Sequence, residues 1–266
     1  MQSLLKASLG IAIFAALYSP IAAQESREKK DGKLYELRFY TTNPGKLPDL
    51  HARFRDHTMK LFEKHGMENI IYWNVSEPAA RSDDDKDNML IYIIAHKDEA
   101  AKDVSWKAFI SDPEWKAAAA KSEENGKILA KAPTAIFMRE TDFSAADEPV
   151  NKSSNVPARL WELRQYNDGA ERVPHTVDRF GSGEKEIFVK HGMQTVKFWT
   201  ATDKSAFIYL LAHKDKAASD ESWKGFRGEF QDFMKTYRDS HPNLPAGRGN
   251  GNVVRFLVPT DYSPRK

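Results

Sequence analysis

Tyr35-Glu36-Leu37-Arg38-Phe39-Tyr40 is a short alternating stretch, and it returns 126 positions later (35 to 161) as Trp161-Glu162-Leu163-Arg164-Gln165-Tyr166. At the same distance, Phe62-Glu63-Lys64-His65-Gly66-Met67 returns as Phe188-Val189-Lys190-His191-Gly192-Met193. Self-similarity over so long a period is typical of a duplicated domain and not of a solenoid.

Further along the chain the distance between the copies falls to 117 (105 to 222), where Ser105-Trp106-Lys107-Ala108-Phe109 matches Ser222-Trp223-Lys224-Gly225-Phe226. The missing residues come out of one acidic loop at 81–88. The sequence therefore predicts two modules that differ in a single loop. We call residues 33–143 module one and residues 159–262 module two, joined by a polar, Pro-bearing linker at 144–158.

The apolar pattern predicts the order β-α-β-β-α-β in each module, which is the ferredoxin-like unit of α+β proteins. In module one we expect strands at 34–40, 69–75, 89–96 and 134–139, and helices at 48–65, at 100–110 and from 113 onward. In module two we expect strands at 160–166, 195–200, 206–213 and 252–258, and helices at 174–191 and 219–240. Helices on one face leave the other face of each sheet bare, so the two sheets should pair as an eight-stranded α+β barrel. Small barrels of that size can hold one ligand.

Residues 1–23 have the features of a secretory signal peptide: Lys6, an apolar run at 9–17, and small residues before Gln24. Residues 24–32 then predict a flexible leader. We expect an exported protein, periplasmic or secreted, with no membrane segment after cleavage. N-terminal sequencing of the exported protein should find a start near Gln24, and retention of Met1 would contradict this expectation.

The composition of the chain argues against several kinds of binding partner and functional site. The chain has 40 basic and 38 acidic residues, interleaved along its length, so it carries no electrostatic signal for nucleic acid. It has no cysteine, which excludes disulfides, thiolate metal sites and a lipid-anchored N-terminus. No His-Glu-x-x-His, P-loop or dinucleotide fingerprint occurs, so we predict no metal site and infer no cofactor from a motif.

Four elements of module one carry a resemblance to a known family: Tyr35-Glu36-Leu37-Arg38-x-Tyr40, Pro44-Gly45-Lys46-Leu47, Phe62-x-Lys64-His65-Gly66-Met67 and Asp112-Pro113-Glu114-Trp115. With them the chain resembles the NIPSNAP family of the dimeric α+β barrel superfamily, over 33–143 and less sharply over 159–262. The resemblance implies the barrel fold and pairing of the two sheets. The wider superfamily includes monooxygenases, haem-degrading enzymes and binding proteins, so the fold does not choose a function.

Module two departs from this pattern after its last helix begins. The Asp-Pro-Glu-Trp element has no counterpart there, where the chain reads Glu229-Phe230-Gln231-Asp232-Phe233. Any role that the resemblance gives to that element therefore belongs to module one alone.

Strict alternation divides each strand into two faces. We expect the apolar set, such as Tyr35, Leu37 and Phe39, to face the helices. The polar set should then face the other module and form the candidate site: Glu36, Arg38, Tyr40, Tyr92 and His96, with Glu162, Arg164, Tyr166, Tyr209 and His213.

This polar set supports more than one function. In a ligand site, arginine would bind an anionic or carbonyl group and histidine or tyrosine would move a proton. In a structural role, the same residues form an internal ion-pair network that specifies docking. Our first hypothesis is an exported small-molecule-binding protein with its site between the sheets, with cofactor-free enzymatic activity as an option.

A structural or protein-interaction module with a packed interior is the alternative. A haem-binding protein is the third, and it needs His96 or His213 to point into the cavity as an axial ligand. An open interior on the order of several hundred Å3 would favour a ligand over a scaffold. Pairing of the modules is intramolecular, and assembly into a homo-oligomer through outer sheet edges is left open.

Other aromatic and histidine residues fit a structural role. His57 follows Leu50 and Phe54 at helical spacing and should lie on the apolar stripe. Trp106 and Trp223 should lie in the core. His65 and His191 each precede a glycine at a helix end, where a cation is favourable.

Overall fold

The computed structural model describes residues 27–29, 32–77, 86–144, 159–245 and 251–266. The predicted signal peptide, most of the linker and most of the acidic loop lie outside these residues. Module one contains β1 (Leu34–Thr41), α1 (Leu47–Arg53), the π-helical turn η1 (Phe54–Thr58), α2 (Met59–Lys64), β2 (Glu68–Glu77), β3 (Met89–His96), α3 (Glu99–Ser111), α4 (Pro113–Ser122) and β4 (Thr134–Glu140).

Module two contains β5 (Leu160–Tyr166), α5 (Val173–Arg179), the π-helical turn η2 (Phe180–Glu184), α6 (Lys185–Lys190), β6 (Gln194–Ala201), β7 (Phe207–His213), α7 (Lys216–Ser240) and β8 (Asn252–Pro259). In the part of the chain that the structure describes, no helix is long and apolar enough to cross a membrane.

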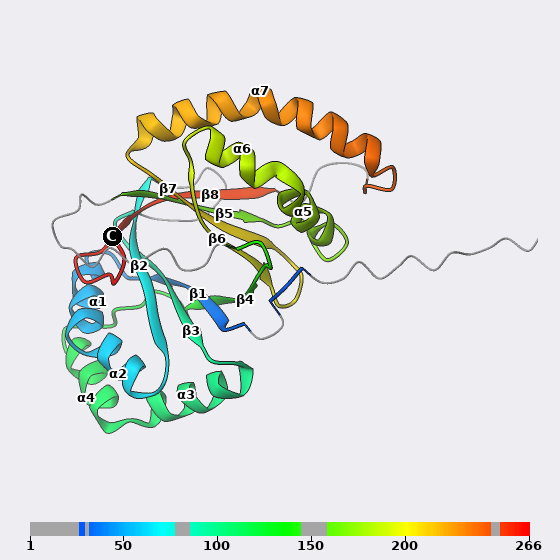
Figure 1. Ribbon diagram of the computed structural model, residues 1–266. Coiled ribbons are helices and arrows are strands. Elements are labelled where there is room, and N and C mark those ends of the chain that lie inside the picture. The colour runs from blue at the N-terminus through cyan, green and yellow to red at the C-terminus, as the bar shows by residue number, and fades with distance from the viewer. Residues whose placement is uncertain (1–26, 30–31, 78–85, 145–158, 246–250) are drawn as a thin grey trace, which may run out of the picture.

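The eight strands close into one antiparallel barrel in the order β1-β3-β2-β8-β5-β7-β6-β4. The order β4-β1-β3-β2 of module one recurs as β8-β5-β7-β6 in module two. Two seams join them, one between β2 and β8 and one between β4 and β6. Every strand is therefore bonded on both sides, and the outer edges through which we left assembly open do not exist in this barrel. Helices α1–α4 and α5–α7 cover its two opposite sides (Figure 1).

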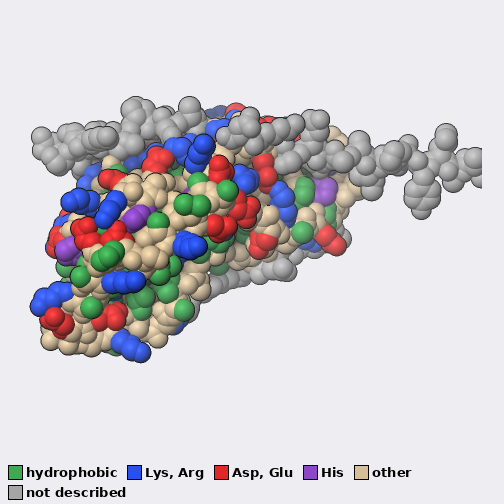
Figure 2. All heavy atoms as spheres, turned by 90° about the horizontal axis from the view of Figure 1, so that it is seen from below, with side chains coloured by type: hydrophobic (Ala, Val, Ile, Leu, Met, Phe, Trp, Pro, Cys, Tyr) green, Lys and Arg blue, Asp and Glu red, His purple; other side chains and the backbone are tan. Residues whose placement is uncertain are grey.

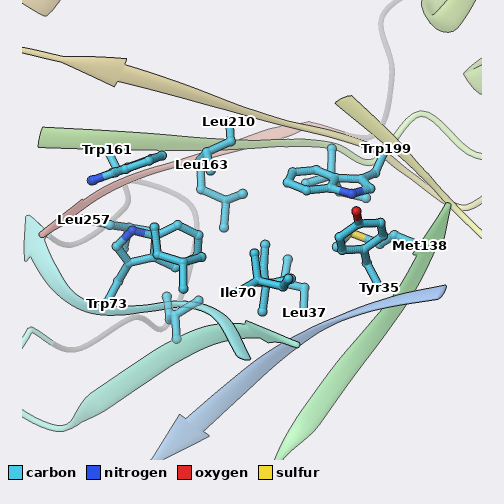
Figure 3. Packing of buried hydrophobic residues seen from close by; sticks show 14 of the residues in the cluster. Tyr35, Leu37, Ile70, Trp73, Met138, Trp161, Leu163, Trp199, Leu210 and Leu257 are labelled. Atoms are coloured by element: carbon cyan, nitrogen blue, oxygen red, sulfur yellow. The ribbon is translucent and has the colours of Figure 1, made fainter. Parts of the chain in front are cut away.

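The inside of the barrel is apolar and filled by side chains from both modules (Figure 3). Trp73 contacts Trp161 across one seam, with ring centroids 6.1 Å apart. Tyr35 contacts Trp199 near the other, at 5.7 Å. The cavity beside Tyr35 and Trp199 has a volume of only about 10 Å3, which is room for one water molecule. The interior between the sheets is packed, and an open ligand cavity there, our first expectation, is wrong.

Our assignment of the two strand faces is reversed in the structure. Tyr35, Leu37 and Phe39 point into the barrel, not toward the helices. Tyr40, Tyr92 and Ile94 instead pack against the helices of module one. The physical reason is the supply of partners: on the helix side the indoles of Trp106 and Trp223 donate to Glu36 and Glu162. Charged side chains on the interior side need partners of their own, as Glu140 finds in Lys197 at 3.0 Å.

Each module has a π-helical turn at the same place in its first helix, Phe54–Thr58 and Phe180–Glu184. The extra residue in such a turn rotates the following residues about the helix axis relative to a regular α-helix. Thr58 is consequently buried while His57 is exposed, so our placement of His57 on the apolar stripe is wrong. Gly66 and Gly192 end the helices with positive φ of 79° and 77°, as expected of capping glycines.

The second helical region is where the modules differ most. In module one, Asp112 caps the start of α4 through a bond from the Glu114 backbone N–H (2.7 Å), with Pro113 as its first residue. The chain bends there, and α4 packs back against α1 and η1. Module two lacks this signal, and α7 runs uninterrupted for 25 residues (Figure 1).

A short segment after the last strand of each module fastens it to the other module. Ser144 accepts a bond from the Phe198 N–H of β6 (3.1 Å), and Ser263 accepts one from the equivalent Tyr72 N–H of β2 (3.0 Å). The two segments read Thr141-Asp142-Phe143-Ser144 and Thr260-Asp261-Tyr262-Ser263, a repeat that our sequence analysis did not find. Ser144, expected in the linker, is therefore buried in the fold.

Residues 27–29 also differ from the flexible leader expected at 24–32. Glu28 forms a β-bridge with Thr141, and the Lys29 ammonium donates to the Glu140 carboxylate at 2.6 Å. Residues 27–29 therefore lie beside the end of β4, close to the seam between β4 and β6. On the face that Figure 2 presents, acidic and basic side chains are interleaved, as they are along the sequence.

Candidate functional site

A buried glutamate is the centre of a hydrogen-bonded cluster in module two. Glu162 lies on β5 and is fully buried. One of its oxygens accepts bonds from His213 Nε2 of β7 and from Trp223 Nε1 of α7, both at 2.8 Å. The other accepts from Arg164 Nε at 2.7 Å. Ser219 Oγ adds a longer bond of 3.3 Å, so the carboxylate is fully satisfied.

Module one repeats the cluster with equivalent residues. Glu36 accepts bonds from His96 Nε2 at 3.0 Å and from Trp106 Nε1 at 2.8 Å, and it pairs with Arg38. The Arg38 guanidinium lies over the Trp106 ring, 4.5 Å from its centroid. The corresponding Arg164 lies 3.8 Å from the centroid of Trp223. The indole thus both donates to the glutamate and covers the arginine.

Both clusters lie between the sheet and the helices, not between the two sheets. Our prediction that Arg38 and Arg164 point into the inter-sheet space is therefore wrong. The alternation correctly separated the polar from the apolar residues of each strand. The polar set faces the helices and the apolar set faces the other module, which is the reverse of our expectation. All ten predicted site residues do lie on one kind of face, five in each module.

Hydrogen bonds hold both glutamates in their charged form. Burial alone would raise the pKa of Glu162, but the bond from His213, the charge of Arg164 and the bond from Trp223 outweigh it and lower the pKa. The pKa of Glu36 is lowered in the same way by His96, Arg38 and Trp106. A lowered carboxyl pKa stabilises the fold above the ordinary glutamate pKa, and that contribution is lost as pH falls through the lowered value.

In module two the cluster continues through two tyrosines to a cavity. Arg164 donates to Tyr166 Oη at 3.3 Å and to Tyr209 Oη at 3.4 Å, and the two hydroxyls are 2.8 Å apart. Burial raises the pKa of Tyr209 well above its ordinary value, so it stays protonated. Tyr166 lies on the wall of the cavity, which links the buried ion pair to a space that a ligand can enter.

The cavity has a volume of about 580 Å3 and is open to solvent. It lies between the end of β5, the helix α5 and the last third of α7. Its lining side chains are predominantly polar and include Tyr166, Asp168, Arg172, His175, Arg179 and Arg238. This volume is in the range of sites that bury a small organic molecule.

Module one closes the equivalent position with α4. Arg53, the counterpart of Arg179 (53 to 179), lies 5.5 Å from the centroid of the Trp115 ring. Trp115 in turn packs on Phe109 at 4.5 Å. Module two has no residue aligned with Trp115, since α7 continues straight where α4 would fold back. Phe230 of α7 instead packs on Phe226, the counterpart of Phe109, at 5.0 Å and lies 5.7 Å from Arg179. The cavity lies by the last third of α7, in the module that lacks the Asp-Pro-Glu-Trp element.

A second buried ion pair supports the wall of the cavity. Arg179 Nε lies 2.5 Å from the Glu184 carboxylate, which is buried. Burial raises the pKa of Glu184 and outweighs the opposing charge of Arg179. Thr58 occupies the equivalent position in module one (58 to 184), so this pair belongs to the open module only.

The structure also bears on the predicted absence of a metal site and on the haem-binding hypothesis. Among the described residues, no three histidine, aspartate or glutamate side chains gather in a way that could hold a metal ion. His96 and His213 are both engaged with buried glutamates, and neither lies on the 580 Å3 cavity. The axial ligand that a haem site needed from one of these two histidines is therefore not directed into a cavity.

The structure brings Tyr166 of the predicted residues to the cavity. The other four of module two form the buried cluster behind it, and the five of module one form the equivalent cluster on the opposite side of the barrel. Sequence reasoning missed Arg172, His175 and Arg179, and it placed Trp106 and Trp223 only as core. A position-by-position comparison of the two modules could have drawn attention to Arg172, His175 and Arg179. It shows that His175 replaces Asp49 and that no residue aligns with Trp115.

The fold is an eight-stranded α+β barrel, and one family model matches part of the chain. Residues 35–145 match the model of the NIPSNAP family, which covers module one; the match does not extend to module two. No curated protein matches the chain.

Three solved structures illustrate the likeness. A nipsnap family protein with unknown function from Agrobacterium tumefaciens is 18% identical with a TM-score of 0.36, over 44% of this chain and 96% of that chain. A putative monooxygenase from Fusobacterium nucleatum is 12% identical with a TM-score of 0.49, over 90% of this chain and 100% of that one. A putative monooxygenase from Lactobacillus acidophilus is 10% identical with a TM-score of 0.49, over 86% and 94%.

Proposed function

We propose that this protein is a small-molecule-binding α+β barrel whose ligand occupies the cavity of module two. The observation that carries the proposal is the 580 Å3 space lined by Tyr166, His175 and Arg179, next to a barrel interior that side chains fill. A cavity of this size with convergent polar groups is the usual form of a ligand site. Each chain then has one such site, because α4 covers the equivalent position in module one.

The buried cluster supports this site by fixing its wall. Glu162 holds Arg164, and Arg164 holds the hydroxyls of Tyr166 and Tyr209. A side chain that is bonded in this way presents one geometry to a ligand, and little ordering is left for the moment of binding. A cofactor-free reaction in this cavity would draw on His175 or Asp168, because imidazole and carboxylate side chains are common general acids and bases.

A scaffold or protein-interaction module is the second candidate, and the packed barrel interior favours it. In that case the cavity of module two is an unused hollow, and no small molecule accompanies the purified protein. We also propose that the protein is exported, because residues 1–23 have the features of a secretory signal peptide. N-terminal sequencing of the exported protein, with an expected start near Gln24, tests this part of the proposal.

Native mass spectrometry of the protein purified from its own host tests the binding proposal. We expect a retained small molecule at one copy per chain. Met234 lies on α7 and lines the cavity, so Met234→Trp should fill the space and remove that extra mass. Lys116→Trp, on the exposed face of α4, is the matched control and should retain it. A chain that never carries an extra mass would favour the scaffold, and an extra mass that survives Met234→Trp would contradict this cavity as the site.

A further inference from the structure

The hydroxyl of Tyr209, behind the cavity wall, has a single acceptor available to it. Tyr209 is fully buried, and its ring packs on Phe180 at 5.0 Å and on Phe188 at 5.8 Å, which carry no lone pair. Within the described part of the chain, the hydroxyl meets Arg164 at 3.4 Å and Tyr166 Oη at 2.8 Å. Arginine has donors only, so Tyr209 donates its proton to Tyr166.

That direction leaves the proton of Tyr166 unused. Tyr166 Oη accepts from Arg164 at 3.3 Å and from Tyr209, which occupies both of its lone pairs. Among the residues that the structure describes, none accepts a bond from its own O–H. The reverse direction would leave the Tyr209 proton unpaired in the core, which is the costlier arrangement. Tyr166 is only 9% exposed and lines the cavity, so its proton is directed into that space.

The groups around this proton are donors whose charges are already balanced. Arg164 Nε donates to the buried Glu162 at 2.7 Å. Arg179, whose charge acts on Tyr166, is paired with the buried Glu184. A ligand hydroxyl or amine would bring a proton of its own to these donors and meet no lone pair on them. A carboxylate would add a negative charge where both cations have a counter-ion. An uncharged group that only accepts hydrogen bonds, such as a carbonyl oxygen, complements this point.

We infer that the ligand of this cavity is a carbonyl compound whose oxygen accepts a hydrogen bond from the Tyr166 hydroxyl. Its apolar body lies along Met234, Leu244 and Pro245. The Arg164 cation behind Tyr166 polarises the O–H, which strengthens the bond to the carbonyl oxygen. A donor fixed in this way also favours negative charge that develops on that oxygen. The inference rests on the proposed function and adds to it the chemical class of the ligand.

Two probes of the same shape test this assignment. 2-Acetylnaphthalene has a carbonyl group, and 2-ethylnaphthalene has a methylene group in its place. We expect the full chain to bind the ketone at one site and more tightly than the hydrocarbon in fluorescence titrations. Tyr166→Phe should raise the dissociation constant of the ketone by about fivefold or more, as expected for loss of one hydrogen bond. It should leave that of the hydrocarbon unchanged. The infrared carbonyl band of the bound ketone should lie at a lower wavenumber in the wild type than in Tyr166→Phe.

Two further variants complete the design. Tyr40→Phe removes the equivalent hydroxyl from module one, where Arg38 donates to it at 3.4 Å, and should change the binding of neither probe. Tyr209→Phe leaves the Tyr166 proton free, so the dissociation constant of the ketone should stay within about threefold of wild type. If Tyr166 donated to Tyr209 instead, Tyr209→Phe would release that proton and tighten ketone binding. Thermal melting of each variant confirms that it is folded before titration.

The outcomes distinguish this inference from the proposed function. The carbonyl inference is overturned if the wild type binds neither probe or binds the ketone no more tightly than the hydrocarbon. It is also overturned if Tyr166→Phe leaves the dissociation constant of the ketone within about twofold of wild type, or if Tyr209→Phe lowers it by about fivefold. Binding of either probe that Met234→Trp abolishes would still uphold the cavity as a ligand site. If Met234→Trp changes the binding of neither probe, the proposed site itself fails.

Discussion

Glu162→Gln is expected to lower the free energy of unfolding by about 3–5 kcal/mol, the range for breaking a buried ion pair by removing one partner. Glutamine has the shape of glutamate but not its charge, so Arg164 is left as a buried cation without a counter-ion. His213 and Trp223 also lose a charged acceptor. Urea or thermal unfolding of the full chain measures the change.

The matched controls are available within the chain. Glu36→Gln in module one should have a loss of similar size, because its partners are equivalent. Glu68→Gln breaks the exposed pair with Lys33 and should change stability by no more than about 1 kcal/mol. Adding Arg164→Met to Glu162→Gln should recover part of the loss, since the stranded charge is removed. A loss below about 1 kcal/mol for Glu162→Gln would contradict a buried, charged pair.

Module one expressed alone, residues 33–143, is not expected to be a stable monomer. In the whole chain β2 pairs with β8 and β4 pairs with β6, so isolation creates two free strand edges. Isolation also exposes the barrel face that includes Ile71 and Trp73, which module two covers. Ile94 of β3 is not part of that face, because it packs against the helices of module one. Size-exclusion chromatography with light scattering should find dimers or aggregates.

A dimer of the isolated module would itself be informative. Two copies can close the same eight-stranded barrel, since β2 and β4 would each find an equivalent edge in the partner. Trp73→Ala in the full chain tests the same interface without truncation and should lower stability by about 3–5 kcal/mol, as for other large aromatic truncations in a core. A soluble, cooperatively folded monomer of residues 33–143 would contradict the closed barrel.

The repeat predicted the strand order because a duplicated pattern constrains two copies at once. The alternation in Tyr35–Tyr40 and its copy predicted which residues share a face, and the paired modules predicted a barrel. The same alternation could not say which face was inside. Glu36 and Arg38 are polar and need hydrogen-bond partners. The sequence does not show whether the other module or a helix of the same module supplies those partners.

Closure of the barrel decided that question. Inside it, Trp73, Trp161 and Trp199 fill most of the space, and the buried Glu140 is paired there with Lys197. On the helix side, the indoles of Trp106 and Trp223 arrive at hydrogen-bonding distance of the glutamates. Those contacts join residues that are 61 and 70 positions apart in the sequence, so no local sequence pattern predicts them.

The cavity depended on tertiary structure more strongly still. The sequence by itself determined that module two lacks the Asp-Pro-Glu-Trp element, and it determined the duplicated order of strands and helices, because caps, glycine ends and alternation act over a few residues. Only the folded chain decided that a 580 Å3 space lies between α5 and the end of α7, with Arg172 and Arg238 on its wall. A hollow is bounded by segments distant in sequence, and whether it stays empty depends on how all of them pack at once.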